Sequence, residues 1–341
     1  MVKRIELGNR KLRVGIIGLG RIASLYEDDA RAKAYYPCLT HAGSYARHPE
    51  VELICGADID AERREWFGKK WGVKGIYADY REMLEGNDLD ILSVCTHPEH
   101  HYVILQAARK KVKVIFCEKP FTRGSEEIED IVQWQERDDA KITINLYREY
   151  DESHRRVRAL LQQERYGAIQ RVNCYIGKGL RNMGTHLLGY VMNTLGMPKE
   201  ITVFNKSFST AARECSYDVY LKFPGDIPCL IQACDYERFR LFEMDFVCTE
   251  GRLQILDEGL KIAVYEVGEN RAETGAKELR RVRRGIRSTI GYALGGAVEH
   301  LVRLVREPAL APAVSPQRYL DIQRVIEEIE KQGGRIKCMH N

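Results

Sequence analysis

The first half of the chain alternates short apolar runs with amphipathic stretches, and this alternation limits the fold more than any other feature. The apolar runs lie at 12–18, 51–58, 90–96, 112–118 and 141–147, with helical patterns at 60–71, 99–111 and 125–137. Continuous apolar strands that alternate with helices indicate a parallel sheet covered on both faces. We therefore predict an α/β fold in which residues 1–145 form a doubly wound parallel sheet.

From residue 168 the pattern changes, because strand-like segments follow one another with only short gaps. They are IQRVNCYIG, EITVFNKSF, YDVYLKF, PCLIQAC, LFEMDFVCT, GRLQILD and LKIAVYEV. Such a run predicts a mainly antiparallel sheet. We expect a solvated loop at 268–287, helices near 291–306 and 317–333, and a second α+β domain that comprises residues 146–341.

Composition and charge exclude several classes of protein. The net charge of +4 is small and dispersed, which argues against a nucleic-acid partner. No apolar run approaches the roughly 18 residues of a membrane span, and the N-terminus lacks the pattern of a signal peptide. The ten cysteines include no CxxC pair, so we expect reduced thiols, no metal site and a cytoplasmic protein.

The turn after the first apolar run fits a dinucleotide-binding fingerprint. The sequence GIIGLGRIAS places Gly18, Gly20 and Ala23 between a strand and a helix-like stretch. Gly18 permits a tight turn, Gly20 lets the backbone approach a pyrophosphate, and Ala23 allows close packing of helix and sheet. This arrangement predicts that the first domain is a Rossmann domain.

Asp58 ends the second apolar run, where a carboxylate can bind a ribose hydroxyl. The alternative is a plain turn residue, because Asp58 lies far beyond the roughly 20 residues expected after the glycines. The excess maps to an insertion at 24–41, which we expect either near the cofactor or as a surface loop. An acid here favours NAD over NADP, although Arg63 and Arg64 follow closely, so NADP stays possible.

Three stretches together resemble the Gfo/Idh/MocA oxidoreductases, the family of glucose-fructose oxidoreductase and inositol dehydrogenase. They are GLGRIA, the AD at 57–58, and CTHPEHHYVILQAARKKVKVIFCEKPF. The resemblance covers most of the chain. It implies NAD(P)-dependent hydride transfer to or from a secondary alcohol of a sugar, cyclic polyol or nucleotide-sugar. It also implies an open antiparallel sheet in the second domain and a homodimer or homotetramer.

The CEKPF segment supplies the first catalytic candidate. An ammonium beside the reacting oxygen stabilises a developing alkoxide, and Lys119 ends a strand where ligands bind in such sheets. In the family the peptide between this lysine and Pro120 is commonly cis, and Glu118 could orient the lysine. The cofactor-binding residues that we expect are Gly18, Gly20, Arg21, Ile22, Asp58, Thr96, Pro98, His101, Glu118 and Lys119. His100 is expected to face solvent.

The second domain supplies the other catalytic candidates. The segment GKGLRNMGTHLLGYVMNTLG resembles the family's stretch in which an Asp precedes a His by four residues. The His is His186, which suits general-base chemistry. Asn182 occupies the Asp position and can only position groups by hydrogen bonding. The substrate-binding residues that we expect are Tyr147, Arg148, Lys178, Arg181, Asn182 and His186.

Other functions remain open on the same fold. A dehydratase, a redox-assisted hydrolase or an imine reductase would change the chemistry, and a sugar or cofactor sensor would lack catalysis. Asn182 weakens the catalytic set and favours these alternatives, whereas the presence of both Lys119 and His186 favours an enzyme. The sequence does not identify the substrate.

Overall fold

A computed structural model describes residues 10–135, 137–138, 140–209 and 214–336. The described residues form two compact units. Unit 1 comprises the chain up to Tyr150 together with Gly291–Leu320, and unit 2 comprises Asp151–Ile290 and the chain from Asp321 onward. The chain first passes from unit 1 to unit 2 after Tyr150, close to the expected boundary at 145/146. Residues 291–320, however, were expected in the second domain and instead belong to unit 1.

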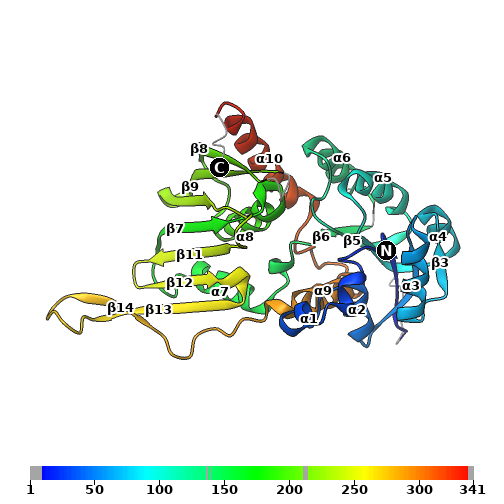
Figure 1. Ribbon diagram of the computed structural model, residues 1–341, viewed down its shortest axis with the longest axis horizontal. Helices are drawn as coiled ribbons and strands as arrows, with labels where there is room; N and C mark the ends of the chain where they lie inside the picture. Colours follow the sequence, from blue (N-terminus) through cyan, green and yellow to red (C-terminus); the bar gives the residue numbers. More distant parts are fainter. Residues whose placement is uncertain (1–9, 136, 139, 210–213, 337–341) are drawn as a thin grey trace. The chain divides into compact units, whose positions relative to one another are not determined.

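Unit 1 contains a parallel six-stranded sheet with the order β3-β2-β1-β4-β5-β6. Figure 1 labels β3, β5 and β6 of this sheet. The strands are β1 (Leu12–Ile17), β2 (Val51–Ala57), β3 (Gly75–Tyr77), β4 (Leu89–Val94), β5 (Val112–Cys117) and β6 (Lys141–Ile144). The predicted doubly wound sheet is confirmed. The strand order reverses between β1 and β4, and ligands bind at such a switch point, beyond the carboxyl ends of the strands.

The helices of unit 1 connect these strands and cover the sheet. They are η1 (Leu25–Asp28), α1 (Ala30–Tyr35), α2 (His41–Arg47), α3 (Ala61–Trp71), α4 (Tyr80–Gly86), α5 (Pro98–Ala108), α6 (Ser125–Gln135), η2 (Tyr147–Glu149) and α9 (Ala293–Arg306). α9 packs on α2, β4, β5 and η2. Its buried face, which includes Val298 and Leu301, joins one apolar core with Val14 and Val114. This burial explains why residues 291–320 belong to unit 1.

Unit 2 contains an eight-stranded sheet with the order β14-β13-β12-β11-β7-β10-β9-β8. The strands are β7 (Ile169–Ile176), β8 (Glu200–Ser209), β9 (Glu214–Phe223), β10 (Ile227–Ala233), β11 (Phe242–Cys248), β12 (Gly251–Leu256), β13 (Lys261–Glu269) and β14 (Lys277–Arg281). All neighbours are antiparallel except β7 and β10, so the predicted mainly antiparallel sheet is confirmed.

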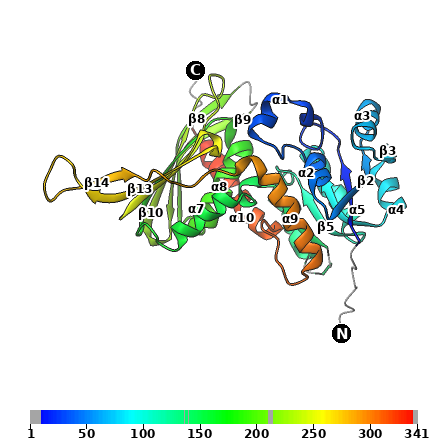
Figure 2. The same cartoon turned by 90° about the horizontal axis from the view of Figure 1, so that it is seen from below.

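Helices cover one face of this second sheet. α7 (Glu152–Gln162), α8 (Thr185–Leu195) and α10 (Pro316–Gly333) lie on the same side (Figure 2). Buried and half-buried residues alternate along β11 and β12, as expected for a sheet with one covered face. Within the described ranges, no helix is both long and apolar enough to cross a bilayer.

The expected solvated loop at 268–287 is wrong in part. Lys277–Arg281 form β14, which pairs with β13 along Tyr265–Glu269 and builds a hairpin at the edge of the sheet. The sequence concealed this strand because nearly all of its side chains are charged and exposed. An edge strand of this kind has no buried face and therefore no apolar alternation.

Candidate functional site

A pocket of about 690 Å³ lies in unit 1 beyond the carboxyl ends of β1, β2 and β4. Its lining includes the expected residues Gly18, Gly20, Arg21, Ile22, Asp58 and Thr96. Gly18 has φ +84°, and a Cβ there would lie 2.7 Å from the backbone nitrogen of Thr96. Glycine is therefore required where the turn after β1 meets the end of β4, and the backbone is left open to a ligand.

Asp58 fixes the glycine turn. Its Oδ2 accepts a hydrogen bond from the backbone N–H of Leu19 at 2.7 Å, and Oδ1 accepts one from Asp60 at 2.9 Å. The side chain is largely buried but still lines the pocket. Because each carboxylate oxygen carries two lone pairs, both can accept further bonds from ribose hydroxyls. The turn role and the cofactor role are thus compatible in one residue.

Three arginines give this pocket a positive character. Arg21 lies over the ring of Tyr26, Arg81 lies over the ring of Tyr80, and the Nη1 atom of Arg63 is 3.7 Å from Oδ2 of Asp58. All of these residues line the pocket. The cations, the aromatic rings and the open glycine backbone fit a dinucleotide, whose pyrophosphate is anionic and whose adenine is planar.

Some lining residues were not found from the sequence. Tyr80 and Arg81 start α4, a short helix that the apolar pattern did not reveal, although Asp79 is a recognisable N-cap. Tyr26 belongs to the segment 24–41, so the insertion does reach the pocket. His100 is mostly exposed, as expected, but it also contributes to the pocket.

Four of the expected cofactor-binding residues, all within the described part of the chain, lie outside the pocket lining: Pro98, His101, Glu118 and Lys119. Pro98 is the first residue of α5. The two ring nitrogens of His101 each lie 3.0 Å from a backbone carbonyl, Nδ1 from Phe121 and Nε2 from Thr96. Burial lowers the pKa of His101 although both carbonyls act against this shift. His101 thus connects the turns that follow β4 and β5, which is a structural role that the sequence did not distinguish from cofactor binding.

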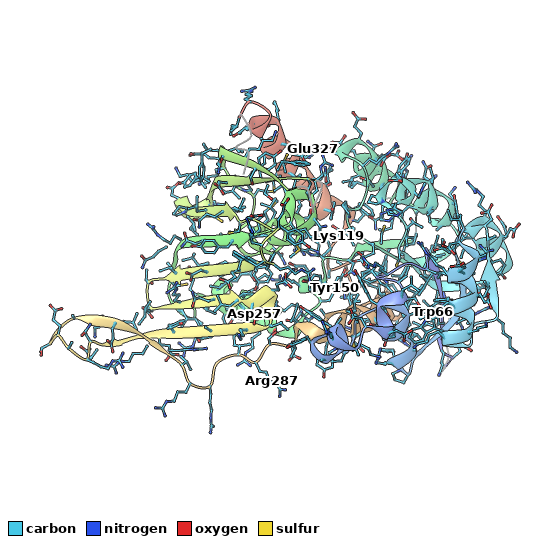
Figure 3. The ribbon with its side chains drawn as sticks, in the orientation of Figure 1. Trp66, Lys119, Tyr150, Asp257, Arg287 and Glu327 are labelled. Atoms are coloured by element: carbon cyan, nitrogen blue, oxygen red, sulfur yellow. The ribbon has the colours of Figure 1, made fainter. Side chains whose placement is uncertain are left out.

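Lys119 follows β5 at the carboxyl edge of the same sheet (Figure 3). The Lys119–Pro120 peptide is cis, as the resemblance implies. Glu118 is buried, and its Oε2 accepts a hydrogen bond from the backbone N–H of Lys119 at 3.2 Å. Burial tends to raise the pKa of Glu118, but hydrogen bonds from His41 and Asn145 outweigh it and leave that pKa below its usual value.

The remaining candidates show three kinds of environment. Arg148 is buried in unit 1, with its guanidinium 4.6 Å from the centre of the Tyr147 ring. Arg181 of unit 2 makes two 2.6 Å hydrogen bonds with Glu330, which gives it a structural ion pair. The ammonium of Lys178 lies 5.7 Å from the centre of the Tyr236 ring.

His186, the expected base, and Asn182, expected to position groups, lie at a helix start in unit 2. His186 is buried and is the second residue of α8. Asn182 precedes it in a π-helical turn, Gly179–Gly184, so the spacing of four does not fall within one regular α-helix. Lys119 belongs to unit 1 and His186 to unit 2. The common site that we expect for them stays a prediction.

Comparisons with known proteins relate the first domain to an oxidoreductase family. Residues 12–146 match the profile of the "Oxidoreductase family, NAD-binding Rossmann fold". A myo-inositol 2-dehydrogenase of Thermotoga maritima is 23% identical over 156 residues, which are 46% of this chain and 42% of that protein. A trans-1,2-dihydrobenzene-1,2-diol dehydrogenase of Sus scrofa is 21% identical over 52% of this chain and 58% of that protein. The chain thus spans about half the length of these relatives.

Solved structures resemble the chain over nearly its whole length. An oxidoreductase from Agrobacterium radiobacter, in complex with NAD⁺, L-tartaric acid and magnesium, has a TM-score of 0.75 at 14% identity. That match covers 95% of this chain and 97% of the other. A myo-inositol 2-dehydrogenase from Lactobacillus plantarum has a TM-score of 0.73 at 16% identity and covers 95% and 98%. At these identities the likeness shows the fold.

Proposed function

Because residues 12–146 belong to the Gfo/Idh/MocA oxidoreductases, with their NAD-binding Rossmann fold, we propose that the protein is an NAD(P)-dependent dehydrogenase. Its substrate would be a secondary alcohol of a sugar, a cyclic polyol or a nucleotide-sugar. The observation that carries this proposal is the glycine-lined pocket on the sheet edge that also bears Lys119. The names of the curated relatives, an inositol and a dihydrodiol dehydrogenase, support a cyclic alcohol.

In this proposal the residues of the chain divide the work. The bound nicotinamide would take up or return a hydride. Backbone N–H groups at the turn of Gly18 and Gly20 would bind the pyrophosphate, and Asp58 would bind the adenosine ribose. Lys119 would stabilise the alkoxide with its charge. His186 would receive the hydroxyl proton, and Asn182 would orient His186 or a neighbouring hydroxyl.

The test mixes the purified protein with NAD⁺ or NADP⁺ and a panel of inositols, cyclic diols, aldoses and nucleotide-sugars. Formation of reduced nicotinamide is followed by its fluorescence. Lys119→Ala and His186→Ala should each reduce turnover by at least ~10² while leaving the Kd for NAD unchanged, because a positioned acid or base contributes about that much. Absence of turnover with every alcohol would overturn the proposal.

A second candidate is a cofactor-dependent sugar sensor, and Asn182 is the observation that favours it. An amide cannot carry the proton or the charge of the family's Asp at this position. Asn182→Asp should be tolerated by an enzyme and should move its pH optimum through a carboxylate–imidazole pair. A sensor would instead bind cofactor and sugar with no turnover in either form.

For the enzyme we also propose a small-molecule substrate and a cytoplasmic location, without nucleic-acid or membrane partners.

A further inference from the structure

A network of buried, hydrogen-bonded polar side chains reaches Glu118, the residue before Lys119. Nε2 of His41 is 2.9 Å from Oε1 of Glu118, and Nδ1 of His41 is 3.0 Å from Oγ of Ser93. The hydroxyl of Tyr45 lies 2.7 Å from the same Ser93 oxygen. Asn145 donates to Oε1 of Glu118 at 2.6 Å. All five side chains are buried within unit 1.

The hydrogen bonds of this network are compatible with donation in one direction, from Tyr45 toward Glu118. Burial raises the pKa of Tyr45, so its hydroxyl keeps its proton and can donate it to Ser93. Ser93 can then donate to Nδ1 of a neutral His41, whose Nε2–H donates to Glu118. Each group has a partner in this arrangement. His41 therefore presents a fixed donor to the carboxylate, since rotation of this buried ring or tautomer exchange would break two hydrogen bonds.

Glu118 needs such a donor because a buried carboxylate is costly unless it is paired. The titratable groups that face it from neighbouring elements are His41, Lys119, His101, Tyr150, Cys95 and Cys117. Of these, His41 favours the ionised carboxylate through its hydrogen bond, and Lys119 favours it through its charge. The Oε2 atom of Glu118 also accepts a hydrogen bond from the backbone N–H of Lys119. The state of Glu118 thus sets both the backbone position of Lys119 and the charge beside it.

The inserted segment anchors the histidine. Glu27 is buried, and its carboxylate accepts hydrogen bonds from Thr40 at 2.7 Å and Arg47 at 2.8 Å. Thr40 is the N-cap of α2, and its Oγ1 accepts the backbone N–H of Gly43. His41 is the next residue and the first of α2. Glu27 therefore fixes the start of the helix from which His41 reaches Glu118.

We propose that His41 is a positioning residue for Lys119, and that it acts by holding the Glu118 carboxylate in place beneath the lysine backbone. This inference rests on the proposed function in which Lys119 stabilises the reacting oxygen. It also assigns a role to the segment 24–41, which supplies Glu27 as the support of α2 in addition to Tyr26 in the pocket.

The experiment compares His41→Asn, which shortens the donor, with His41→Gln, whose amide N–H can still reach Glu118. Glu118→Gln removes the charge at similar size. His48→Gln is the matched control, because His48 ends the same helix and also faces a glutamate, Glu299, at 3.1 Å, but in a partly exposed pair. The readouts are kcat, Kd for NAD, thermal unfolding, and the pH midpoint at which trinitrobenzenesulfonate labels Lys119, followed by peptide mass spectrometry.

We expect His41→Asn to lose between about tenfold and about a hundredfold in kcat, because small misplacement of a catalytic group has costs of this size. The labelling midpoint of Lys119 should fall by about one pH unit, because the negative charge of Glu118 is no longer held in place beside the lysine. Glu118→Gln should lower it similarly. His41→Gln should recover most of both effects. His48→Gln should change neither, and the Kd for NAD should hold in both His41 variants and in His48→Gln.

The labelling midpoint separates the two proposals, because it requires no substrate. If the wild-type protein turns over no alcohol, the proposed function fails while the midpoint still tests His41. A folded His41→Asn variant with an unchanged Lys119 midpoint would overturn the inference. So would a Glu118→Gln variant that labels like the wild type, or a loss in His48→Gln equal to that in His41→Asn.

Discussion

Asp58 combines two tasks that are usually considered separately. It ties the glycine turn to the end of β2 through Leu19 and Asp60, and it presents a carboxylate to the pocket that Arg63 also lines. Its charge should repel the 2′-phosphate of NADP, while Arg63 should attract it. Discrimination between the two cofactors therefore depends on the balance of these neighbouring charges.

We predict that Asp58→Ala weakens NAD binding, because it removes the ribose contact and loosens the turn. Asp58→Asn keeps an acceptor for the Leu19 N–H and should instead favour NADP by roughly tenfold relative to NAD, a difference of about 1.4 kcal/mol. Fluorescence titration with both reduced cofactors measures the two Kd values. Unchanged affinities in Asp58→Ala would remove the residue from the cofactor site.

The site residues that the sequence revealed are those that a backbone requirement or an ionisable group makes visible. Gly18 and Asp58 line the pocket as predicted, because a tight turn needs the glycine and a carboxylate at a strand end is a recognisable candidate for a ribose contact. Tyr80 and Arg81 were not found, since they are ordinary residues of a short helix and only the folded chain brings them to the pocket. His101 has the residue type of a ligand, but its contacts are backbone carbonyls.

At the scale of the element, burial decided what could be predicted. β1, β4 and β5 are almost fully buried and apolar, and the sequence located each within about two residues. β3 has only three residues, all half-buried, and a strand of this length is too short to show a periodic pattern. α9 was located as a helix, but an amphipathic pattern does not specify which sheet the apolar face covers.

The start of α7 shows how one element can depend on pH. Asp151 is its N-cap, and its carboxylate accepts hydrogen bonds from His154, Ser153 and Thr289. Although burial tends to raise the pKa of Asp151, these bonds and the charge of His154 lower it from 3.8 to about 2. Because the folded pKa is depressed, the resulting stability is present above about pH 4 and is lost as pH falls toward 2.

We predict that Asp151→Asn lowers the free energy of unfolding by about 2 kcal/mol near neutral pH, and that the difference shrinks below about pH 4. Urea unfolding of the wild type and the variant across this range measures it. Asp29→Asn is the control, since Asp29 caps α1 in an exposed position and should cost less. A difference between wild type and variant that does not depend on pH would show that shape, and not charge, is responsible.

At the scale of the whole molecule, unit 2 presents apolar side chains at the edge of its sheet. Phe204 and Phe208 on β8 are 54% and 53% exposed. Large exposed apolar groups on a sheet edge favour association. We therefore keep the prediction that the protein is a homodimer or homotetramer built on unit 2.

Light scattering of the eluting protein should give a multiple of 39.2 kDa at micromolar concentration. Phe204→Glu should shift this mass toward the monomer, because it would bury a charge in the interface. Phe239→Glu is the matched control: Phe239 is 57% exposed but lies in a loop outside the strands. A wild-type protein that elutes only as a monomer contradicts the prediction.

Unit 1 is built from two separate stretches of chain, and this sets the order in which a growing polypeptide can fold. A ribosome that has released residues up to Tyr150 has made all six strands of the first sheet but not α9, whose Val298 and Leu301 belong to the same core. The part of the core that α9 covers therefore stays exposed in the nascent domain while residues 151–290 are synthesised. The early chain is therefore expected to be a client of ribosome-associated chaperones. Protease resistance of the sheet should emerge in arrested chains only once α9 has left the exit tunnel.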